Sequence, residues 1–385
     1  MSESHFWIKD GIRFVYLSGD SPYEIGYSHG RLLKEEIGEF IEKIKNLIKG
    51  EFGGFLGTII LKFLIFRINL LKKKIPPDVL EEMRGIADGS GQDLKWIITS
   101  NEGYEVFVSL QGLLGLYRCS FFAAPWKDSD YTVIGKTTDL TNYSPLSDIF
   151  SKKRVVFIYD YKWLGKKVIN LSFPMCLSGD TSILEDGSMC AFNDGGWASG
   201  INFRDLPVFI ITKQASKVSK NASDLLGNIK KYKTMKPYVY LISDGTKENS
   251  FLVEACEGDY FVKKFDGRLI NTNHFESEEM RKKHYKKGYE NDILYTNTFE
   301  RYNNLKNNVK EFSNLKEAIE VLKIHEDTFK IDNGSISNLG TVQAYVYFPR
   351  ERKLLIPDGQ KAPVTLNSKW VDFSLDEIFN HKKQS

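Results

Sequence analysis

Cys119 is the residue of this sequence with the clearest capacity for nucleophilic chemistry. It stands in the run RCSFF, where a mostly helical pattern ends and a strand-rich pattern begins. A thiol attacks as the thiolate and therefore needs a base or a positive charge beside it, yet no histidine lies near Cys119 in the sequence. Cleavage between Arg118 and Cys119 would solve this, because the freed α-amino group, with an ordinary pKa of about 7.7–8.0, can act as the base.

Asp139 lies 20 residues after Cys119, at the end of the run GKTTD. One strand, a turn and a returning strand would place Asp139 beside Cys119 on adjacent strands. The carboxylate could then hydrogen-bond the new amine or orient the thiol, while Lys136 supplies positive charge. The residues alone leave the alternatives open, since an Asp at a strand end commonly forms a turn and a lone Cys commonly packs in a core.

The composition excludes several functional classes. The 385 residues are 42% hydrophobic, with 53 Lys and Arg against 50 Asp and Glu, so a large core is expected and a nucleic-acid partner is not. The remaining cysteines, Cys176, Cys190 and Cys256, form no CxxC pair, and we expect them to be buried in strands rather than to bind metal. No phosphate-binding glycine loop is present.

Hydrophobic periodicity predicts an α+β fold with a mostly helical segment before Cys119. A long amphipathic helix is expected from Pro22 to about Glu51. A second helix begins at Pro76-Pro77-Asp78, with Glu81 in capping-box spacing, and ends at the GSG run that finishes at Gly91.

After Cys119, strands and helices come in blocks, which favours α+β over a doubly wound sheet. The predicted strands are Tyr131–Thr138, Arg154–Tyr161, Lys167–Phe173, Ser188–Phe192, Val208–Lys213, Ala344–Phe348 and Lys353–Ile356. The predicted helices are Ala222–Lys231, Leu294–Asn307 and Leu315–His325.

The segment Phe52–Leu71 is about as long as a membrane span. Lys62 and Arg67 interrupt it, and each charge at the bilayer centre would cost about 2.5–3.5 kcal/mol. We therefore expect a buried or half-buried helix, with a hydrophobic flap beside a lipid-like substrate or on a membrane surface as the alternative. In neither case should it span the bilayer.

Six motifs in one order resemble the Ntn-hydrolase family of autoproteolytic cysteine acyltransferases and hydrolases. Penicillin acyltransferase belongs to that family, and choloylglycine hydrolases and acid ceramidase are more distant relatives. The resemblance runs from about Phe14 to Pro363. The motifs are Tyr23–Gly30 (YEIGYSHG), Glu81–Gly91 (EEMRGIADGSG), Cys119–Phe121 (CSF), Gly135–Asp139 (GKTTD), Asn271–Phe275 (NTNHF) and Thr298–Tyr302 (TFERY).

The resemblance implies a role for each matching residue. Cys119 would be the nucleophile of both self-cleavage and turnover, and Asp139 would lie near the new amino terminus. Asn273 would donate from its side chain to the oxyanion, Asn193 would line the same pocket, and Arg301 would support the nucleophile electrostatically.

Two features of the sequence qualify these roles. Lys136 stands where many relatives carry Arg, and a lysine cannot form the bidentate fork of a guanidinium.

His274, next to Asn273, is the histidine best placed to line the pocket, and it is also the natural base for a rival Cys/His thiol mechanism. His29 is expected to be a packing or hydrogen-bonding residue.

The resemblance implies a four-layer αββα sandwich, with residues 1–118 and 119–385 as the two chains of one structural domain after self-cleavage. The expected reaction is amide hydrolysis or acyl transfer through a thioester, with a small N-acyl amide or acyl donor as partner. This reaction needs no metal or nucleotide, so we expect no cofactor. A Cys/His hydrolase without self-cleavage and a non-catalytic lipid- or membrane-surface-binding protein are the alternatives. No signal peptide is evident at the first residues, so a cytoplasmic location is expected.

Overall fold

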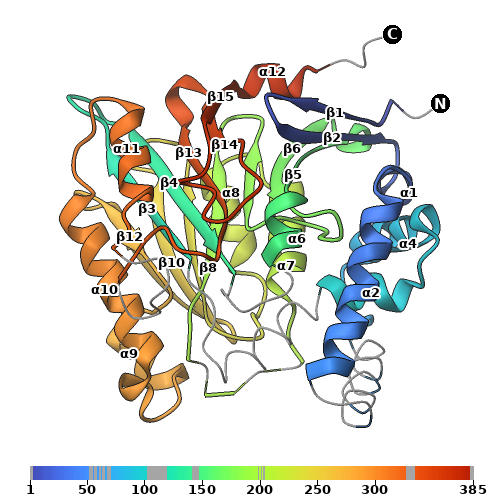
Figure 1. Cartoon of the computed structure of the whole chain (residues 1–385), viewed down its shortest axis with the longest axis horizontal. Helices are drawn as coiled ribbons and strands as arrows, with labels where there is room; N and C mark the ends of the chain where they lie inside the picture. The colour runs from blue at the N-terminus through green and yellow to red at the C-terminus, as the bar shows by residue number, and fades with distance from the viewer. Residues whose placement is uncertain are drawn as a thin grey trace.

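The computed structural model shows a mixed α and β chain with two β-sheets (Figure 1). It describes residues 3–51, 55, 59, 62, 66, 71–101, 119–140, 147–197, 199–200, 202, 204–326 and 334–381. Within these residues the larger sheet has nine strands, in the spatial order β1 (His5–Lys9), β2 (Ile12–Gly19), β5 (Val155–Tyr161), β6 (Lys166–Ser172), β7 (Thr181–Leu184), β8 (Met189–Asp194), β9 (Tyr238–Ser243), β10 (Ser250–Cys256) and β11 (Asp259–Lys264).

The smaller sheet carries the segment that begins at Cys119. Its described strands lie in the order β12 (Leu269–Asn271), β3 (Ser120–Pro125), β4 (Thr132–Asp139), β13 (Thr341–Phe348), β14 (Lys353–Pro357) and β15 (Trp370–Ser374). Neighbouring strands in both sheets pair antiparallel, except that β2 and β5 are parallel. The parallel pair joins the chain before Cys119 to the chain after it within one sheet.

Alternating side chains divide the core into separate packed regions, as the two-residue period of a strand requires. Phe121 packs in a cluster shared with residues of the larger sheet such as Val156 and Leu241. Its neighbour Phe122 packs on the opposite side, with Leu305 of α10 (Ile293–Asn308). The two sheets therefore share one apolar cluster, and each also packs against helices.

The helices divide between the two sheets. The cluster on the outer side of the larger sheet includes residues of α1 (Pro22–Leu32), α2 (Lys34–Glu51), α4 (Pro77–Ser90), α7 (Val208–Val218) and α8 (Ala222–Ile229). The smaller sheet packs against α10 and α11 (Leu315–Leu322). The remaining described helices are α6 (Ser147–Lys152), α9 (Glu278–His284) and α12 (Leu375–Phe379), with short 3₁₀ turns η1 (Lys162–Leu164), η2 (Tyr289–Asn291) and η3 (Pro349–Glu351).

Four glycines allow α1 and α4 to approach at backbone distance. A Cβ on Gly26 would lie 1.9 Å from the carbonyl oxygen of Glu82, and one on Gly30 would lie 2.3 Å from that of Ile86. The converse holds for Gly85 and Gly89, where a Cβ would lie 2.2 Å from a carbonyl oxygen of α1. The first two family-like motifs are therefore the two halves of one tight helix–helix contact.

Several predicted elements are confirmed, and one predicted strand is wrong. The strands predicted near β4, β5, β6, β8, β13 and β14 are present, as are the helices near α8, α10 and α11. Val208–Lys213 is instead the start of α7. Every residue of that run is buried, so the run lacks the exposed polar face that marks a surface helix. Its β-branched residues also favour the prediction of a buried strand.

The region before Cys119 also differs from its prediction. The expected helix from Pro22 to Glu51 is divided at Leu33 into α1 and α2. The second helix, α4, ends as expected at Gly91, which adopts a left-handed conformation. Its predicted capping box is absent, because the residue at the N-cap position is Pro76 and makes no side-chain hydrogen bond there. Strands β1 and β2 precede α1, and the helical pattern of this region does not reveal them.

The apolar segment Phe52–Leu71 lies mostly outside the described residues. Where it is described, Phe55 and Phe66 are 84% and 63% exposed and Leu71 is buried. A fully buried helix is therefore wrong at the two phenylalanines, whereas a half-buried helix and a hydrophobic flap are both compatible with these exposures. Within the part of the chain that the structure describes, no helix has both the length and the apolarity needed to cross a membrane.

Substitution of Gly85 by Ala should destabilise the protein strongly. The added methyl group would meet the backbone of α1 at 2.2 Å, and a backbone cannot yield as a flexible side chain can. We expect the free energy of unfolding, measured by urea denaturation, to fall by about 3 kcal/mol.

Gly227→Ala in α8 is the matched control. No atom lies within 4 Å of the position that its added methyl group would occupy, and alanine favours a helix over glycine by about 0.5–1 kcal/mol. Equal effects of the two substitutions would contradict the close contact between α1 and α4.

Candidate active site

The β3–β4 hairpin brings Cys119 and Asp139 together. Ser120 pairs with Thr137 across the hairpin, so Cys119, one residue earlier, lies level with Thr138 and beside Asp139 at the end of β4. Gly135 is required by the packing of the hairpin, because a Cβ there would lie 2.3 Å from the Phe122 ring. The adjacency expected from the 20-residue spacing is therefore present.

The backbone of Cys119 is held on both sides of its α-carbon. Its N–H donates to Asn273 Oδ1 at 2.8 Å. Its carbonyl oxygen accepts a hydrogen bond from Arg301 Nη1 at 2.7 Å. Both Cys119 and Asn273 are buried, so these contacts fix the nitrogen of the expected cleavage bond inside the protein.

Arg301 links Cys119 to Asn273 with a single buried guanidinium. Its Nη2 donates to Asn273 Oδ1 at 2.8 Å, and its Nη1 also reaches Ser120 Oγ at 3.1 Å. Because Cys119 N–H and Arg301 Nη2 are both donors, they determine which atom of the Asn273 amide is the oxygen. The Nδ2 of Asn273 donates instead to the carbonyl oxygen of Asp194 at 3.0 Å.

Helix α10 presents Arg301 and Thr298 on one face, as their three-residue spacing allows. Thr298 Oγ1 accepts the backbone N–H of Asn273 at 2.8 Å. Asn297, four residues before Arg301, accepts from its Nε at 2.9 Å. The run TFERY therefore positions both the guanidinium and the segment that carries Asn273.

Lys136 lies fully buried one strand away from Cys119. Its Nζ donates to Asn193 Oδ1 at 2.9 Å and to the carbonyl oxygen of Phe192 at 3.0 Å. Asn193 in turn donates from Nδ2 to the carbonyl oxygen of Thr272 at 2.9 Å. Asn193 thus connects Lys136 to the Asn273 segment through β8.

Asp180 balances the charge of Lys136, although the sequence analysis does not single it out. Its Oδ2 lies 3.5 Å from Lys136 Nζ and accepts a hydrogen bond from Thr138 Oγ1. Its Oδ1 accepts from Gln343 Nε2 at 3.1 Å. It lies in the connection between β6 and β7, far from Cys119 in the sequence, and no local pattern marks it.

Burial raises the pKa of the Cys119 thiol to about 11 in the continuous chain. The positive charge of Lys136 and the backbone N–H of Asp139 lower it, whereas the carboxylates of Asp139 and Asp180 raise it. The Asp139 carboxylate is itself oriented by Asn338, whose Nδ2 donates to Oδ2 at 3.0 Å. At neutral pH this thiol is therefore protonated unless a nearby base removes its proton.

His274 is buried and stacks on Phe299, with the ring centroids 4.3 Å apart. Its Nδ1 contacts Thr298 Oγ1 at 3.1 Å. Burial lowers its pKa to about 3, and the positive charge of the nearby Arg301 acts in the same direction. A neutral imidazole of such low basicity is a poor general base at neutral pH.

The other expectations have mixed outcomes. His29 is buried and hydrogen-bonds the carbonyl oxygen of Pro174 at 2.6 Å, as a packing residue should. Cys190 and Cys256 are buried in strands, whereas Cys176 is buried in a loop after β6. Arg118 lies outside the described residues. Among the residues described, no group of three or more His, Cys, Asp or Glu side chains is arranged to hold a metal ion.

No model of a protein family matches the chain. Among curated proteins, it is 24% identical over 290 residues to an uncharacterized protein of Archaeoglobus fulgidus, a match that covers 66% of this chain and 45% of that protein. It is 30% identical over 127 residues to protein dcd1A of Dictyostelium discoideum, a match that covers 28% of each. The chain thus spans less than half the length of these relatives.

Three solved structures are similar to the chain at low sequence identity. The Caenorhabditis elegans ortholog of N-acylethanolamine-hydrolyzing acid amidase has a TM-score of 0.43 and 12% identity, and the match covers 60% of this chain and 93% of that one. A mutant conjugated bile acid hydrolase of Clostridium perfringens has a TM-score of 0.41 and 10% identity, with 69% of this chain and 95% of that one covered. Penicillin V acylase of Agrobacterium tumefaciens has a TM-score of 0.42 and 12% identity, with 67% of this chain and 87% of that one covered.

Replacement of His274 by Asn should make stability less dependent on pH. The folded-state pKa of His274 is about 3, below its unfolded value, so its contribution is complete above about pH 6.5 and is lost as the pH falls toward 3. Between pH 7 and pH 5 the wild-type protein should lose about 2 kcal/mol more unfolding free energy than the variant. Urea denaturation at both pH values measures this, and parallel losses in the two proteins would show that His274 is not buried as described.

Proposed function

We propose that this protein is an N-terminal-cysteine amide hydrolase or acyltransferase of the Ntn type, which cleaves itself between Arg118 and Cys119. The observation that carries the proposal is the pair of contacts on Cys119. Its backbone nitrogen is held by Asn273 Oδ1, and its carbonyl oxygen is held by Arg301. Any buried backbone N–H needs an acceptor, but here the acceptor is the Asn273 side chain, whose Oδ1 also accepts from Arg301, and the motif resemblance marks both of these residues.

Self-cleavage would begin with attack of the Cys119 thiol on the carbonyl carbon of Arg118. A C–S bond forms, the C–N bond breaks and the thiol proton ends on the nitrogen, which gives a thioester and a free amine. Water then hydrolyses the thioester to the Arg118 carboxylate and regenerates the thiol. Asn273 Oδ1 already accepts the N–H of that nitrogen, so it can retain the amine as it forms.

The new amine would supply the base that the intact site lacks. Burial raises the thiol pKa to about 11, and the pKa of His274 is about 3, so His274 is poorly matched to deprotonate the thiol. An α-amine with a pKa of about 8 is closer to working pH and is attached to the nucleophile itself. This argues against the rival Cys/His mechanism.

In turnover, the thiolate would attack the carbonyl of a small N-acyl amide, and water or an amine would release the acyl group from the thioester. The Nδ2 of Asn273 donates to the Asp194 carbonyl oxygen in the intact chain, so donation to a substrate oxyanion requires a modest reorientation or a shared hydrogen bond. Lys136 and Arg301 add positive charge around the thiolate, and Asn193 orients Lys136.

The proposal includes the domain organisation. The two sheets and their helices would be the αββα sandwich of Ntn hydrolases, and residues 1–118 and 119–385 would remain one structural domain after cleavage. The parallel pairing of β2 with β5 supports this, because it joins the two parts by sheet hydrogen bonds over six residue pairs.

Denaturing mass spectrometry of the purified protein should show two fragments, residues 1–118 and 119–385, that elute together under native conditions. Cys119→Ala should remain full-length and inactive, because it lacks the attacking atom. Cys190→Ala, which removes another buried thiol, is the control and should still be cleaved. An active protein that is only ever full-length would overturn the proposal.

Asn273→Ala and His274→Asn should differ in a hydrolysis assay with a panel of N-acyl amides. In cleaved protein, Asn273→Ala should lower kcat by about two to three orders of magnitude, as loss of an oxyanion donor does. His274→Asn should cost far less, because the amine is the base. The reverse ranking would favour the Cys/His mechanism.

A further inference from the structure

The hydroxyl group of Tyr285 lies where two segments of the candidate site meet. We call Asp194–Gly196, at the end of β8, the glycine segment, and Asn273–Phe275, after β12, the asparagine segment. The backbone N–H of Phe275 donates to Tyr285 Oη at 2.6 Å, and the same hydroxyl donates to the carbonyl oxygen of Gly195. One buried oxygen therefore connects the asparagine segment to the glycine segment.

The chemistry of the three groups fixes the direction of both hydrogen bonds. A backbone N–H can only donate and a carbonyl oxygen can only accept, so the hydroxyl accepts from Phe275 and donates to Gly195. Burial raises the pKa of Tyr285 well above its ordinary value, so the hydroxyl keeps the proton that it donates. Phenylalanine at this position would retain the ring but would leave both backbone groups without this partner.

The two segments are in direct contact around this hydroxyl. A Cβ on Gly196, where φ is +80°, would lie 2.7 Å from the carbonyl oxygen of Asn273. A Cβ on Gly195 would lie 3.0 Å from the Phe275 ring. The rings of Phe275 and Tyr285 also stack, with their centroids 5.3 Å apart. A shift of either segment would therefore disturb the other.

We propose that Tyr285 is a positioning residue for Asn273, the oxyanion donor of the proposed function. The Nδ2 of Asn273 donates to the carbonyl oxygen of Asp194 at 3.0 Å, so the place of this donor depends on how the two segments lie against each other. The Tyr285 hydroxyl holds that arrangement from the residues next to this contact. The inference rests on the proposed function for its catalytic consequence, because a displaced catalytic group can lower a rate by about a hundredfold.

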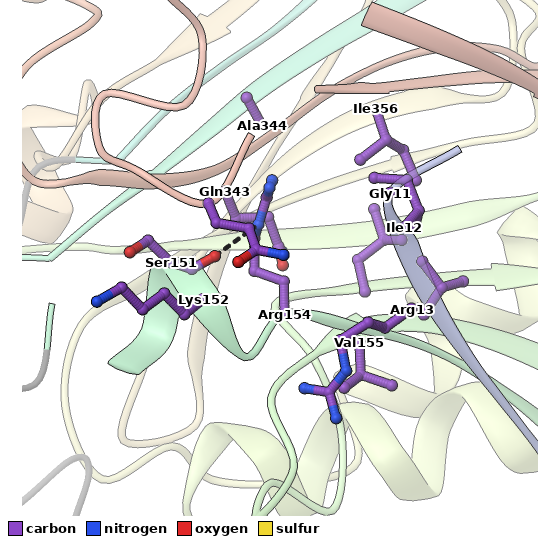
Figure 2. A pocket seen from close by; sticks show the side chains of 13 residues that line it. Gly11, Ile12, Arg13, Ser151, Lys152, Arg154, Val155, Gln343, Ala344 and Ile356 are labelled. Atoms are coloured by element: carbon purple, nitrogen blue, oxygen red, sulfur yellow. Dashed lines mark hydrogen bonds between the residues drawn. The ribbon is translucent and has the colours of Figure 1, made fainter. Parts of the chain in front are cut away.

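Tyr347 offers a matched control for loss of a buried tyrosine hydroxyl. It is also buried, and its hydroxyl also donates to a glycine carbonyl oxygen, that of Gly187, at 2.7 Å. It lies on β13, the strand whose Gln343 and Ala344 line the pocket in Figure 2. Strands β3 and β4 separate β13 from β12, which precedes Asn273. Tyr347→Phe therefore removes a similar hydrogen bond away from the asparagine segment.

Steady-state hydrolysis of hexanoyl and phenylacetyl p-nitroanilides by the cleaved protein tests the catalytic consequence. Tyr285→Phe should lower kcat about 10- to 100-fold and change KM by less than about threefold, because the hydroxyl positions a donor that acts on the transition state. Tyr347→Phe should keep kcat within about twofold of the wild-type value, although both variants should unfold at lower urea concentrations. Equal losses of kcat in the two variants would overturn the proposal.

Two NMR measurements test the positioning itself and do not require activity. The backbone N–H of Phe275 should exchange slowly with solvent in the wild-type protein and at least about tenfold faster in Tyr285→Phe. The side-chain NH2 signals of Asn273 should shift in Tyr285→Phe and stay unchanged in Tyr347→Phe. Rapid exchange at Phe275 in the wild-type protein would overturn the proposal even if Tyr285→Phe fails to fold.

The two kinds of measurement separate this inference from the proposed function. A wild-type protein that is neither cleaved nor active would contradict the proposed function, whereas slow exchange at Phe275 and shifted Asn273 signals in Tyr285→Phe would still show that the hydroxyl positions Asn273. A cleaved Tyr285→Phe variant with wild-type kcat and unshifted Asn273 signals would contradict this inference alone.

Discussion

The buried guanidinium of Arg301 is the interaction on which the candidate site depends. It contacts Cys119, Ser120, Asn273 and Asn297, which come from three separate parts of the chain. A guanidinium can do this because its donors lie in one rigid plane and point in different directions. Lysine at this position could hold one of these partners well, but it could not set the distance between Cys119 and Asn273.

The charges around Cys119 act on the ionisation of its thiol in opposite directions. Lys136 favours the thiolate, and Asp180 partly offsets Lys136 so that the buried cation is tolerated. The carboxylates of Asp139 and Asp180 oppose ionisation of the thiol. The thiol therefore needs a base close to it in order to lose its proton. The α-amino group of Cys119 would be such a base if this residue became N-terminal.

The chain before Cys119 is built into the same structure as the chain after it. Strand β2 pairs with β5, and the glycine contact holds α4 against α1, which follows β2 directly. The buried Lys213 of α7 lies 2.6 Å from Glu82 of α4, and both side chains are 1% exposed. Breaking one peptide bond removes none of these contacts, so cleavage at Cys119 would not require the two parts to separate.

Local features of this protein can be predicted from its sequence. The 20-residue spacing from Cys119 to Asp139 is sufficient to predict their adjacency, because a hairpin is a local structure. Alternating or helical periodicity locates six of the thirteen described strands and three of the seven described α-helices after Cys119 for the same reason. The motif resemblance draws attention to Asn273, Arg301 and Asn193 without any knowledge of the contacts among them.

The contacts between distant residues, and the direction of their hydrogen bonds, depend on how the chain folds in three dimensions. Asp180 and Asn338 carry no local signal, because Thr138 and Asp139, which they contact, lie far away in the sequence. The pattern of Val208–Lys213 predicts a strand because burial on all sides removes the polar face that marks a helix. The orientation of the Asn273 amide follows from two donors that approach it from separate chain segments, and no pattern within its own segment contains that information.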